Sequence, residues 1–179
     1  RIPILEVAGY EADDVIGTLA TEAGRQGIIT YMMTPDKDYG QLVSDKVFMY
    51  RPKHTGGFEV MGVDEVKAKF DIQSPAQVID MLGLMGDSSD NIPGCPGVGE
   101  KTAQKLIAEF GSIENLLEHT DQLKGALKTK VETNREMITF SKFLATIKID
   151  VPIQLDMDSL VREQADEDSL RQIFEELEF

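Results

Sequence analysis

A short, nearly continuous apolar run at residues 28–33 most restricts what this chain can fold into. The run contains β-branched residues and is too short for most helices, which favours a buried parallel strand. Residues 14–23 before it carry apolar side chains at helical spacing. Two further strands are predicted at 47–50 and 58–61, joined by a hairpin turn at a glycine pair. Helix, strand and polar loop in succession predict an α/β layer.

The second half of the chain changes to helical periodicity. Short, mostly glycine-rich loops separate its predicted helices, and residues 147–155 fit either a strand or a linker. The helices are predicted at 63–70, 75–85, 100–110, 112–119 and 129–145, followed by an acidic amphipathic helix at 160–179. The chain therefore combines an α/β layer with an α-helical part.

Length and composition are those of a globular chain. The 179 residues, 41% of them hydrophobic, suffice for one core, or for one core with a small helical annex. No apolar run approaches membrane-spanning length, and no signal peptide opens the chain. A single cysteine, Cys95, rules out an internal disulfide framework. We expect a soluble, cytoplasmic protein.

The formal net charge of −14 argues against nucleic-acid binding, because phosphate neutralisation needs lysine and arginine. Its distribution weakens that objection. Residues 156–178 hold nine acidic and two basic residues, a net of −7 and half of the total. Other acidic residues form clusters, and a bound divalent cation reverses the local field.

The first acidic cluster comprises Glu11, Asp13 and Asp14, where the first helix begins. Acidic residues at a helix N-terminus commonly cap it and complement its dipole. Capping explains Asp13 or Asp14, but it does not need Glu11 as well. Three carboxylates within four residues repel one another unless a cation or water screens them.

The second cluster, Asp36 and Asp38, directly follows the strand predicted at 28–33. Ligands of open α/β sheets bind beyond the carboxyl ends of strands. If the segment stays extended, both carboxylates point to one side and Lys37 to the other, and the pair can share a hard cation. The alternative is a solvated turn, because aspartate is common in turns.

The third cluster, Asp87 and Asp90, precedes a glycine-rich stretch at 91–102 and a predicted helix. Such a hairpin presents backbone N–H groups and the positive helix end to phosphates. Lys101, Thr102 and Lys105 add charge and a donor, so the segment can hold a DNA backbone without reading bases. A phosphate-binding P-loop is excluded by spacing, whereas an ordinary helix–helix connection stays open.

Together the clusters supply seven carboxylates, a set of oxygen ligands that suits Mg²⁺ or Mn²⁺ better than Zn²⁺. The two histidines, His54 and His119, are separate from these clusters, and surface or local hydrogen-bonding roles are expected for them. Cys95 is interpreted as structural. Carboxylates beside a phosphate-binding hairpin indicate two-metal phosphodiester hydrolysis.

Four segments resemble the 5′-nuclease domain of bacterial DNA polymerase I. They read GYEADDVIGTLA (9–20), TPDKDYGQLV (34–43), LMGDSSDNIPGCPGVGEKTAQKL (84–106) and LATIKIDVPI (144–153). Their order and spacing agree with that family over nearly the whole chain. The resemblance implies an α/β fold, with part of the parallel-sheet layer of the PIN-like 5′-nuclease fold preceding a helix–three-turn–helix DNA-binding subdomain.

The resemblance also implies roles for individual residues. The metal ligands would be Glu11, Asp13, Asp14, Asp36, Asp38, Asp87 and Asp90, and the DNA-binding residues would be Gly94, Gly97, Val98, Gly99, Lys101, Thr102 and Lys105. The implied cofactor is Mg²⁺ or Mn²⁺, with K⁺ in the hairpin loop. The implied partners are 5′-flap DNA, RNA primer–DNA hybrids, and the polymerase and proofreading-type domains of the same polypeptide in the bacterial nucleoid.

The predicted division is 1–70 for the α/β nuclease core, 71–150 for the helical DNA-binding subdomain and 151–179 for an acidic tail or linker. In the resembled family, further aspartate ligands lie on N-terminal strands and basic residues lie on a helical arch, and we expect this chain to lack both. We therefore expect an incomplete metal site, weak or absent activity in isolation, and an exposed sheet edge or apolar face that promotes self-association.

Two alternatives stay open from the sequence. One is a non-catalytic helix-hairpin-helix-type DNA-binding module whose acidic residues only keep it soluble. The other is a small-molecule phosphatase that uses the Asp-x-Asp pair after the strand, although that class needs no DNA-binding hairpin.

Overall fold

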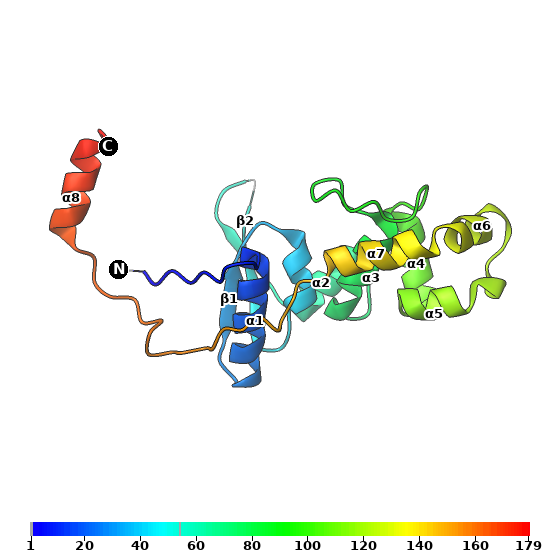
Figure 1. Cartoon of the computed structure of the whole chain (residues 1–179), viewed down its shortest axis with the longest axis horizontal. Coiled ribbons are helices and arrows are strands. Elements are labelled where there is room, and N and C mark those ends of the chain that lie inside the picture. Colours follow the sequence, from blue (N-terminus) through cyan, green and yellow to red (C-terminus); the bar gives the residue numbers. More distant parts are fainter. Residues whose placement is uncertain (1, 54) are drawn as a thin grey trace.

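The computed structural model describes residues 2–53 and 55–179, so His54 lies outside the described residues. The molecule is elongated (Figure 1). A small α/β layer occupies its middle, a group of helices forms one end, and the C-terminal helix α8 projects at the other. The two chain termini lie on the same side as α8.

The α/β layer is built around a three-stranded mixed sheet. Its elements are α1 (Ala12–Arg25), β1 (Thr30–Met33), the 3₁₀ helix η1 (Lys37–Leu42), β2 (Val47–Pro52) and β3 (Phe58–Met61). The strand order is β1-β2-β3, with β1 parallel to β2 and β2 antiparallel to β3. The predicted strands and hairpin are confirmed, but β1 begins two residues later than predicted. The expectation that β1 is buried is wrong, because Met32 is its one buried residue.

The two faces of this sheet differ in burial. Met32, Met49 and Met61 are paired across the three strands and are all buried. On the opposite face Tyr31 stacks on Phe48, and Met33 is 72% exposed. Because side chains alternate along a strand, one face supplies the core and the other stays open. The expected exposed apolar face is therefore present.

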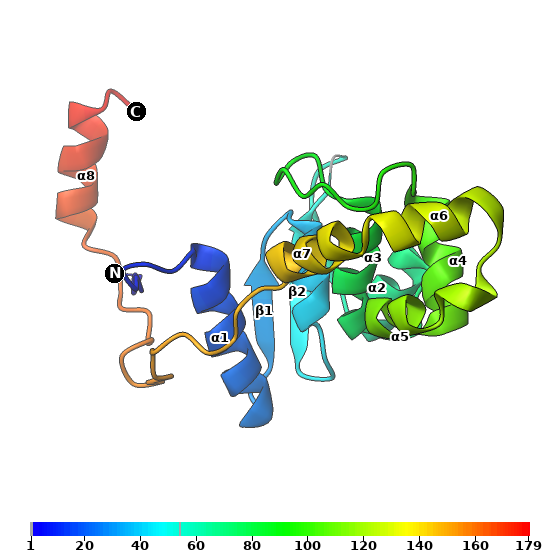
Figure 2. The same cartoon turned by 45° about the vertical axis from the view of Figure 1, so that its right-hand side comes forward.

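The second part of the chain is helical, as predicted. Its elements are α2 (Val63–Phe70), η2 (Pro75–Gln77), α3 (Val78–Met85), α4 (Glu100–Phe110), α5 (Ile113–Glu118), η3 (Thr120–Gln122), α6 (Gly125–Thr133) and α7 (Arg135–Ala145). Helix α3 lies at the centre and packs against α4, α5 and α7 (Figure 2). Gly83 permits the close approach of α5 and α7, because a Cβ there would lie 2.7 Å from Ile113 Cδ1 and 3.0 Å from Lys142 Cβ.

Two helix predictions are corrected. The single helix expected at 129–145 is two helices, divided at Asn134. The Asn134 side chain donates to the Lys130 carbonyl at 2.8 Å, a local hydrogen bond that competes with helix continuation. The helix expected at 75–85 begins as a 3₁₀ turn, with Pro75 at its first position.

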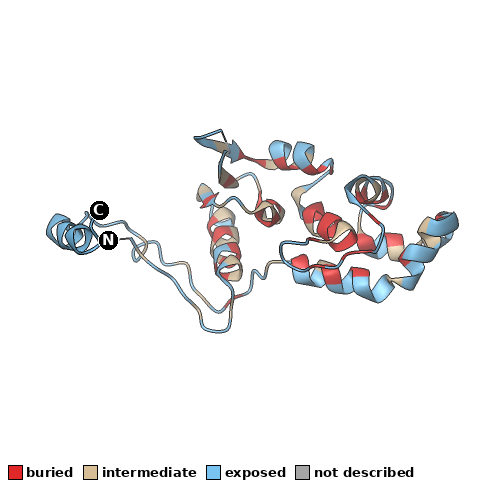
Figure 3. Ribbon diagram, turned by 90° about the horizontal axis from the view of Figure 1, so that it is seen from above, coloured by how far each residue is buried: buried red, intermediate tan, exposed pale blue. Residues whose placement is uncertain are grey.

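The C-terminal segment is largely exposed (Figure 3). Residues 147–155 form no strand in the described structure and run as an extended linker along α1, where Val151 is buried. Helix α8 (Glu167–Glu176) is shorter than the predicted 160–179. Among the described residues, no helix combines the length and apolar character needed to cross a bilayer.

Candidate metal centre and nucleic-acid interface

The three acidic clusters meet at one pocket of about 310 Å³, where α1 and η1 of the α/β layer approach the helical part. Six of the seven predicted ligands line it: Glu11, Asp13, Asp14, Asp36, Asp38 and Asp90. Residues 144–147, at and after the end of α7, form an opposing wall. Segments separated by more than 70 residues in sequence thus place their carboxylates in one cavity.

The seventh residue, Asp87, joins the cluster from the loop after α3. One carboxylate oxygen each from Asp38, Asp87 and Asp90 lies within 4.8 Å of the others. Asp38 and Asp87 are buried, and Asp90 is exposed. This combination of two buried acids and one at the surface leaves an open side toward solvent.

The turn at 36–38 explains how the second cluster is shaped. The Asp36 carboxylate accepts from the Asp38 backbone N–H at 2.9 Å and caps η1. The segment is therefore turned, whereas we expected it to stay extended. As a consequence Lys37 does not point away from the acids: its ammonium donates to Asp87 and lies 3.6 Å from Asp38 Oδ1.

Asp87 is held by its own loop. Its backbone N–H and carbonyl pair with Ile92 at 2.9 and 2.8 Å, and its Oδ1 accepts from the Ser89 N–H at 2.8 Å. Burial alone would raise the pKa of the Asp87 carboxyl, but the Lys37 and Ser89 hydrogen bonds outweigh it and lower that pKa. Asp87 is thus ionised and fixed in orientation.

The residues of the first cluster line the pocket and also form hydrogen bonds at the start of α1. The Glu11 backbone N–H donates to Asp14, and the other oxygen of Asp14 accepts from the Lys148 N–H at 2.9 Å. Asp13 accepts from the Tyr39 hydroxyl at 2.7 Å. Glu11 is itself the N-cap residue of α1, whereas we expected that capping of this helix would not require Glu11.

Asp38 is a buried acid within the pocket. Its side chain is buried, and its Oδ1 has no hydrogen-bond partner among the residues that the structure describes. Burial and the charge of Asp36 raise the pKa of the Asp38 carboxyl to about 6. Partial desolvation of the exposed Asp90 carboxyl, together with the charges of Asp87 and Asp36, also raises its pKa. A buried carboxylate oxygen without a hydrogen bond, in a cluster of three carboxylates, fits a hard divalent cation.

The glycine-rich hairpin is anchored to the helical core. Gly94 and Gly97 adopt positive φ angles of 63° and 77°. The Gly94 N–H donates to Ser141 Oγ at 3.0 Å, and the Cys95 N–H donates to the Leu84 carbonyl at 2.8 Å. Cys95 is buried in the core cluster, consistent with a structural role. These hydrogen bonds attach the hairpin to α3 and α7.

The predicted DNA-binding residues separate into two groups. Gly99 is the N-cap of α4, Lys101 and Lys105 are exposed, and Thr102 is partly exposed. Val98 is buried, so its side chain serves the core and the surface receives only its backbone. The exposed group lies on the side of α4 opposite its buried face.

A further cation at the hairpin was not among the predicted residues. Lys130, on α6, donates from its ammonium to the Gly97 carbonyl at 3.2 Å. The lysine run Lys124, Lys128 and Lys130 was the available signal. Local periodicity does not reveal this contact, because Lys130 reaches the hairpin only through the tertiary placement of α6.

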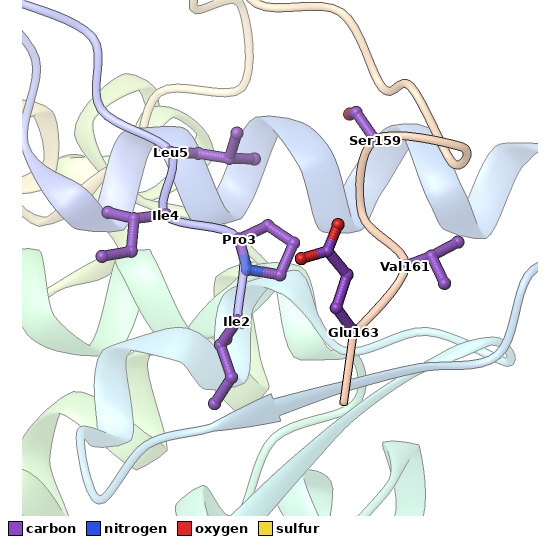
Figure 4. Close-up of a pocket in the computed structure, with 7 residues that line it drawn as sticks. All are labelled: Ile2, Pro3, Ile4, Leu5, Ser159, Val161 and Glu163. Atoms are coloured by element: carbon purple, nitrogen blue, oxygen red, sulfur yellow. The ribbon is translucent and has the colours of Figure 1, made fainter. Parts of the chain in front are cut away.

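A second cleft lies between the N-terminal segment and the linker before α8 (Figure 4). Residues 2–5 form one side, and Ser159, Val161 and Glu163 form the other. It shares no lining residue with the acidic pocket. None of the predicted ligands lies there, so the candidate centre is the acidic pocket.

Sequence comparison identifies the family. Residues 1–71 match the family described as 5′-3′ exonuclease, N-terminal resolvase-like domain, and residues 73–168 match 5′-3′ exonuclease, C-terminal SAM fold. The chain belongs to the 5′-3′ exonuclease family. The predicted family resemblance is confirmed.

Curated relatives of this 5′-3′ exonuclease-family chain are DNA polymerases. It is 42% identical to DNA polymerase I of Bacillus caldotenax and 44% identical to that of Bacillus subtilis, over its whole length in both cases. It is 39% identical to the thermostable DNA polymerase I of Thermus aquaticus over 98% of its length. The chain spans about 20% of the length of each relative and corresponds to their nuclease domain.

Solved structures agree with the fold. T5 5′-exonuclease with bound divalent metal ions (zinc) matches at a TM-score of 0.71 and 23% identity, covering 80% of this chain and 52% of that one. The catalytic core of Rad2 in complex with DNA substrate matches at 0.60 and 16% identity, covering 92% and 55%. The predicted α/β 5′-nuclease fold with a helical second part is confirmed.

Proposed function

We propose that the chain is the metal-binding and DNA-holding part of a 5′-3′ exonuclease and flap endonuclease. The observation that carries the proposal is the buried Asp38 Oδ1, which lacks a hydrogen-bond partner among the described residues and belongs to a three-carboxylate cluster. A buried carboxylate oxygen that lacks a hydrogen bond, and has the Lys37 ammonium only at 3.6 Å, is costly, so the pocket is suited to a cation. This favours a nuclease over a DNA-binding module whose acids only provide solubility.

The residues of the pocket have different roles in binding such a cation. Asp38, Asp87 and Asp90 would hold Mg²⁺ or Mn²⁺, while Glu11, Asp13, Asp14 and Asp36 would complete the pocket or hold a second ion. Tyr39 orients Asp13, and Asp36 orients Asp38 through the backbone. When bound, a divalent ion lowers the pKa of the attacking water and stabilises the leaving oxygen of a phosphodiester.

The hairpin and α4 supply the DNA contact in this proposal. Gly97 and Gly99 allow the backbone to approach a phosphate closely, and Lys101, Thr102 and Lys105 add charge and a donor. Lys130 joins them from α6. Gly94 is buried, and its N–H is bonded to Ser141, so it shapes the hairpin from within. The hairpin carbonyls are candidate ligands for K⁺. We assign residues 1–70 to the α/β core, 71–150 to the DNA-binding part and 151–179 to the tail.

The substrates proposed are 5′ flaps and RNA primers on DNA, cut during replication and repair. The relatives named above are DNA polymerases, which supports a place beside polymerase and proofreading-type domains in the bacterial cytoplasm. The T5 and Rad2 structures carry divalent metal ions and DNA, respectively, which is consistent with both parts of the proposal.

The test measures Mn²⁺ binding and flap-DNA binding by the chain. Cleavage of a 5′-flap duplex is measured with the DNA polymerase that is proposed to contain the chain. Asp38→Asn should abolish Mn²⁺ binding and cleavage while leaving flap-DNA binding in EDTA unchanged. Asp64→Asn, an exposed acid on α2, is the matched control. Flap-DNA binding with no Mn²⁺ site would establish the alternative, a non-catalytic DNA-binding module.

A further inference from the structure

Lys37 places a positive charge inside the carboxylate cluster. Its ammonium donates to Asp87 and lies 3.6 Å from Asp38 Oδ1. The capped turn at 36–38 directs it there, although an extended segment would have turned it away. About one third of the Lys37 side chain remains exposed, so the ammonium lies at the boundary between the cluster and solvent.

The oxygens that Lys37 contacts are those that a metal ion would use. Asp38 and Asp87 are two of the three acids whose oxygens lie within 4.8 Å of one another. Without a cation these carboxylates repel, which would favour protonation or separation of the acids. An ammonium is a compact charge on a flexible four-carbon stem, so it can offset that repulsion and still move away.

We propose that Lys37 is a built-in placeholder for the divalent cation: its ammonium holds Asp38 and Asp87 together in the metal-free protein and is displaced when the ion binds. This inference rests on the proposed function, because it needs a divalent ion at this pocket. Lys37 is accordingly a positioning residue that acts through the two aspartates.

The placeholder has opposite effects on the two states of the site. In the metal-free protein it holds the two carboxylates together, so the site needs little rearrangement when the ion arrives. During binding it competes with the ion, because the Lys37–Asp87 hydrogen bond has to be broken. Removal of the ammonium should therefore weaken the metal-free fold and tighten metal binding.

The experiment measures Mn²⁺ affinity from the electron paramagnetic resonance signal of free Mn²⁺, together with thermal unfolding in EDTA. Lys37→Met keeps the length of the side chain and removes the charge. It should tighten Mn²⁺ binding by about ten-fold, the effect of removing one competing charge-assisted hydrogen bond. It should also lower the unfolding temperature in EDTA and enlarge the stabilisation by Mn²⁺.

Two variants complete the comparison. Lys67→Met removes the same charge from α2 and should bind Mn²⁺ like the wild-type chain. Lys37→Gln removes the charge but retains a donor for Asp87, and it should also tighten binding. It serves as the decisive variant if Lys37→Met does not fold, as judged by circular dichroism.

The outcomes separate the two proposals. Unchanged or weaker Mn²⁺ affinity in a folded Lys37→Met or Lys37→Gln chain overturns the placeholder, while binding that is lost in Asp38→Asn and Asp87→Asn upholds the metal site. If the wild-type chain has no Mn²⁺ site that Asp38→Asn and Asp87→Asn abolish, both proposals are overturned. Tighter binding that Lys67→Met reproduces shows a general charge effect and also overturns the placeholder.

Discussion

The Tyr39 hydroxyl donates a 2.7 Å hydrogen bond to Asp13 and so joins η1 to the first turn of α1. Tyr39 is buried, and burial together with the Asp13 hydrogen bond raises the pKa of its hydroxyl. The phenol is therefore a permanent donor near neutral pH. Through this bond two acidic clusters that are far apart in sequence hold a common geometry.

Tyr39→Phe should weaken Mn²⁺ binding several-fold and lower the free energy of unfolding by about 1 kcal/mol, the contribution of one such hydrogen bond. Titration calorimetry and chemical denaturation measure the two effects. Tyr31→Phe removes a hydroxyl from a tyrosine that is 56% exposed and should change neither. Unaltered Mn²⁺ affinity in Tyr39→Phe would show that Asp13 needs no fixed orientation.

Asp38 predicts a pH dependence. The pKa of its carboxyl rises from the ordinary 3.8 to about 6 in the folded chain, so the folded state binds this proton more tightly. Without metal, its contribution to stability is complete below pH 3.8 and is lost as the pH rises through 6. Mn²⁺ affinity should rise over the same interval, because the ligand has to lose its proton.

Denaturation in EDTA at a series of pH values checks this, with Asp38→Asn as the reference. The asparagine variant cannot titrate at this position, so the wild-type chain should lose stability relative to the variant as the pH rises toward 6. Parallel curves for the two proteins would contradict the raised pKa.

Lys142 and Asp80 form a buried ion pair between α7 and α3, at 2.6 Å. Asp80 also accepts from the Ile113 N–H at 2.9 Å. Lys142→Met should destabilise the fold by about 3 kcal/mol, since a buried carboxylate loses its partner. Chemical denaturation measures the loss, and Lys128→Met, at a surface pair 3.9 Å from Glu132, should cost under about 1 kcal/mol.

Gly94→Ala should destabilise the hairpin strongly. Its φ is +63°, and a Cβ there would overlap the backbone of Gly86. Gly125 has a similar φ of +57° but open space around it, so Gly125→Ala isolates the cost of the backbone angle alone, about 1 kcal/mol. Thermal unfolding should show a clearly larger loss for Gly94→Ala. Equal losses would mean that the hairpin relaxes.

The lysines around the hairpin predict salt-dependent DNA affinity. Lys101→Ala and Lys105→Ala should each weaken flap-DNA binding at low salt and reduce the salt slope by about one unit, regardless of sequence. Fluorescence anisotropy at several salt concentrations measures this. Lys46→Ala, in the loop before β2, is the control. An unchanged slope in both variants would place the DNA elsewhere.

The sequence by itself determined the types of element and the kind of chemistry. Apolar periodicity is a local property, so the strands at 47–50 and 58–61 and helices such as α2 and α4 were predictable. The acidic motifs and the glycine hairpin are contiguous in sequence, so the candidate residues could be named as a set.

Only the tertiary structure decided how those residues meet. The direction of Lys37 depends on the turn at Asp36 and on Asp87, fifty residues away. The burial of Asp38, the Tyr39–Asp13 bond and the position of Lys130 beside Gly97 likewise arise from packing between distant segments. Local patterns carry no information about such distances, because the free energy of a long-range contact depends on the whole folded arrangement.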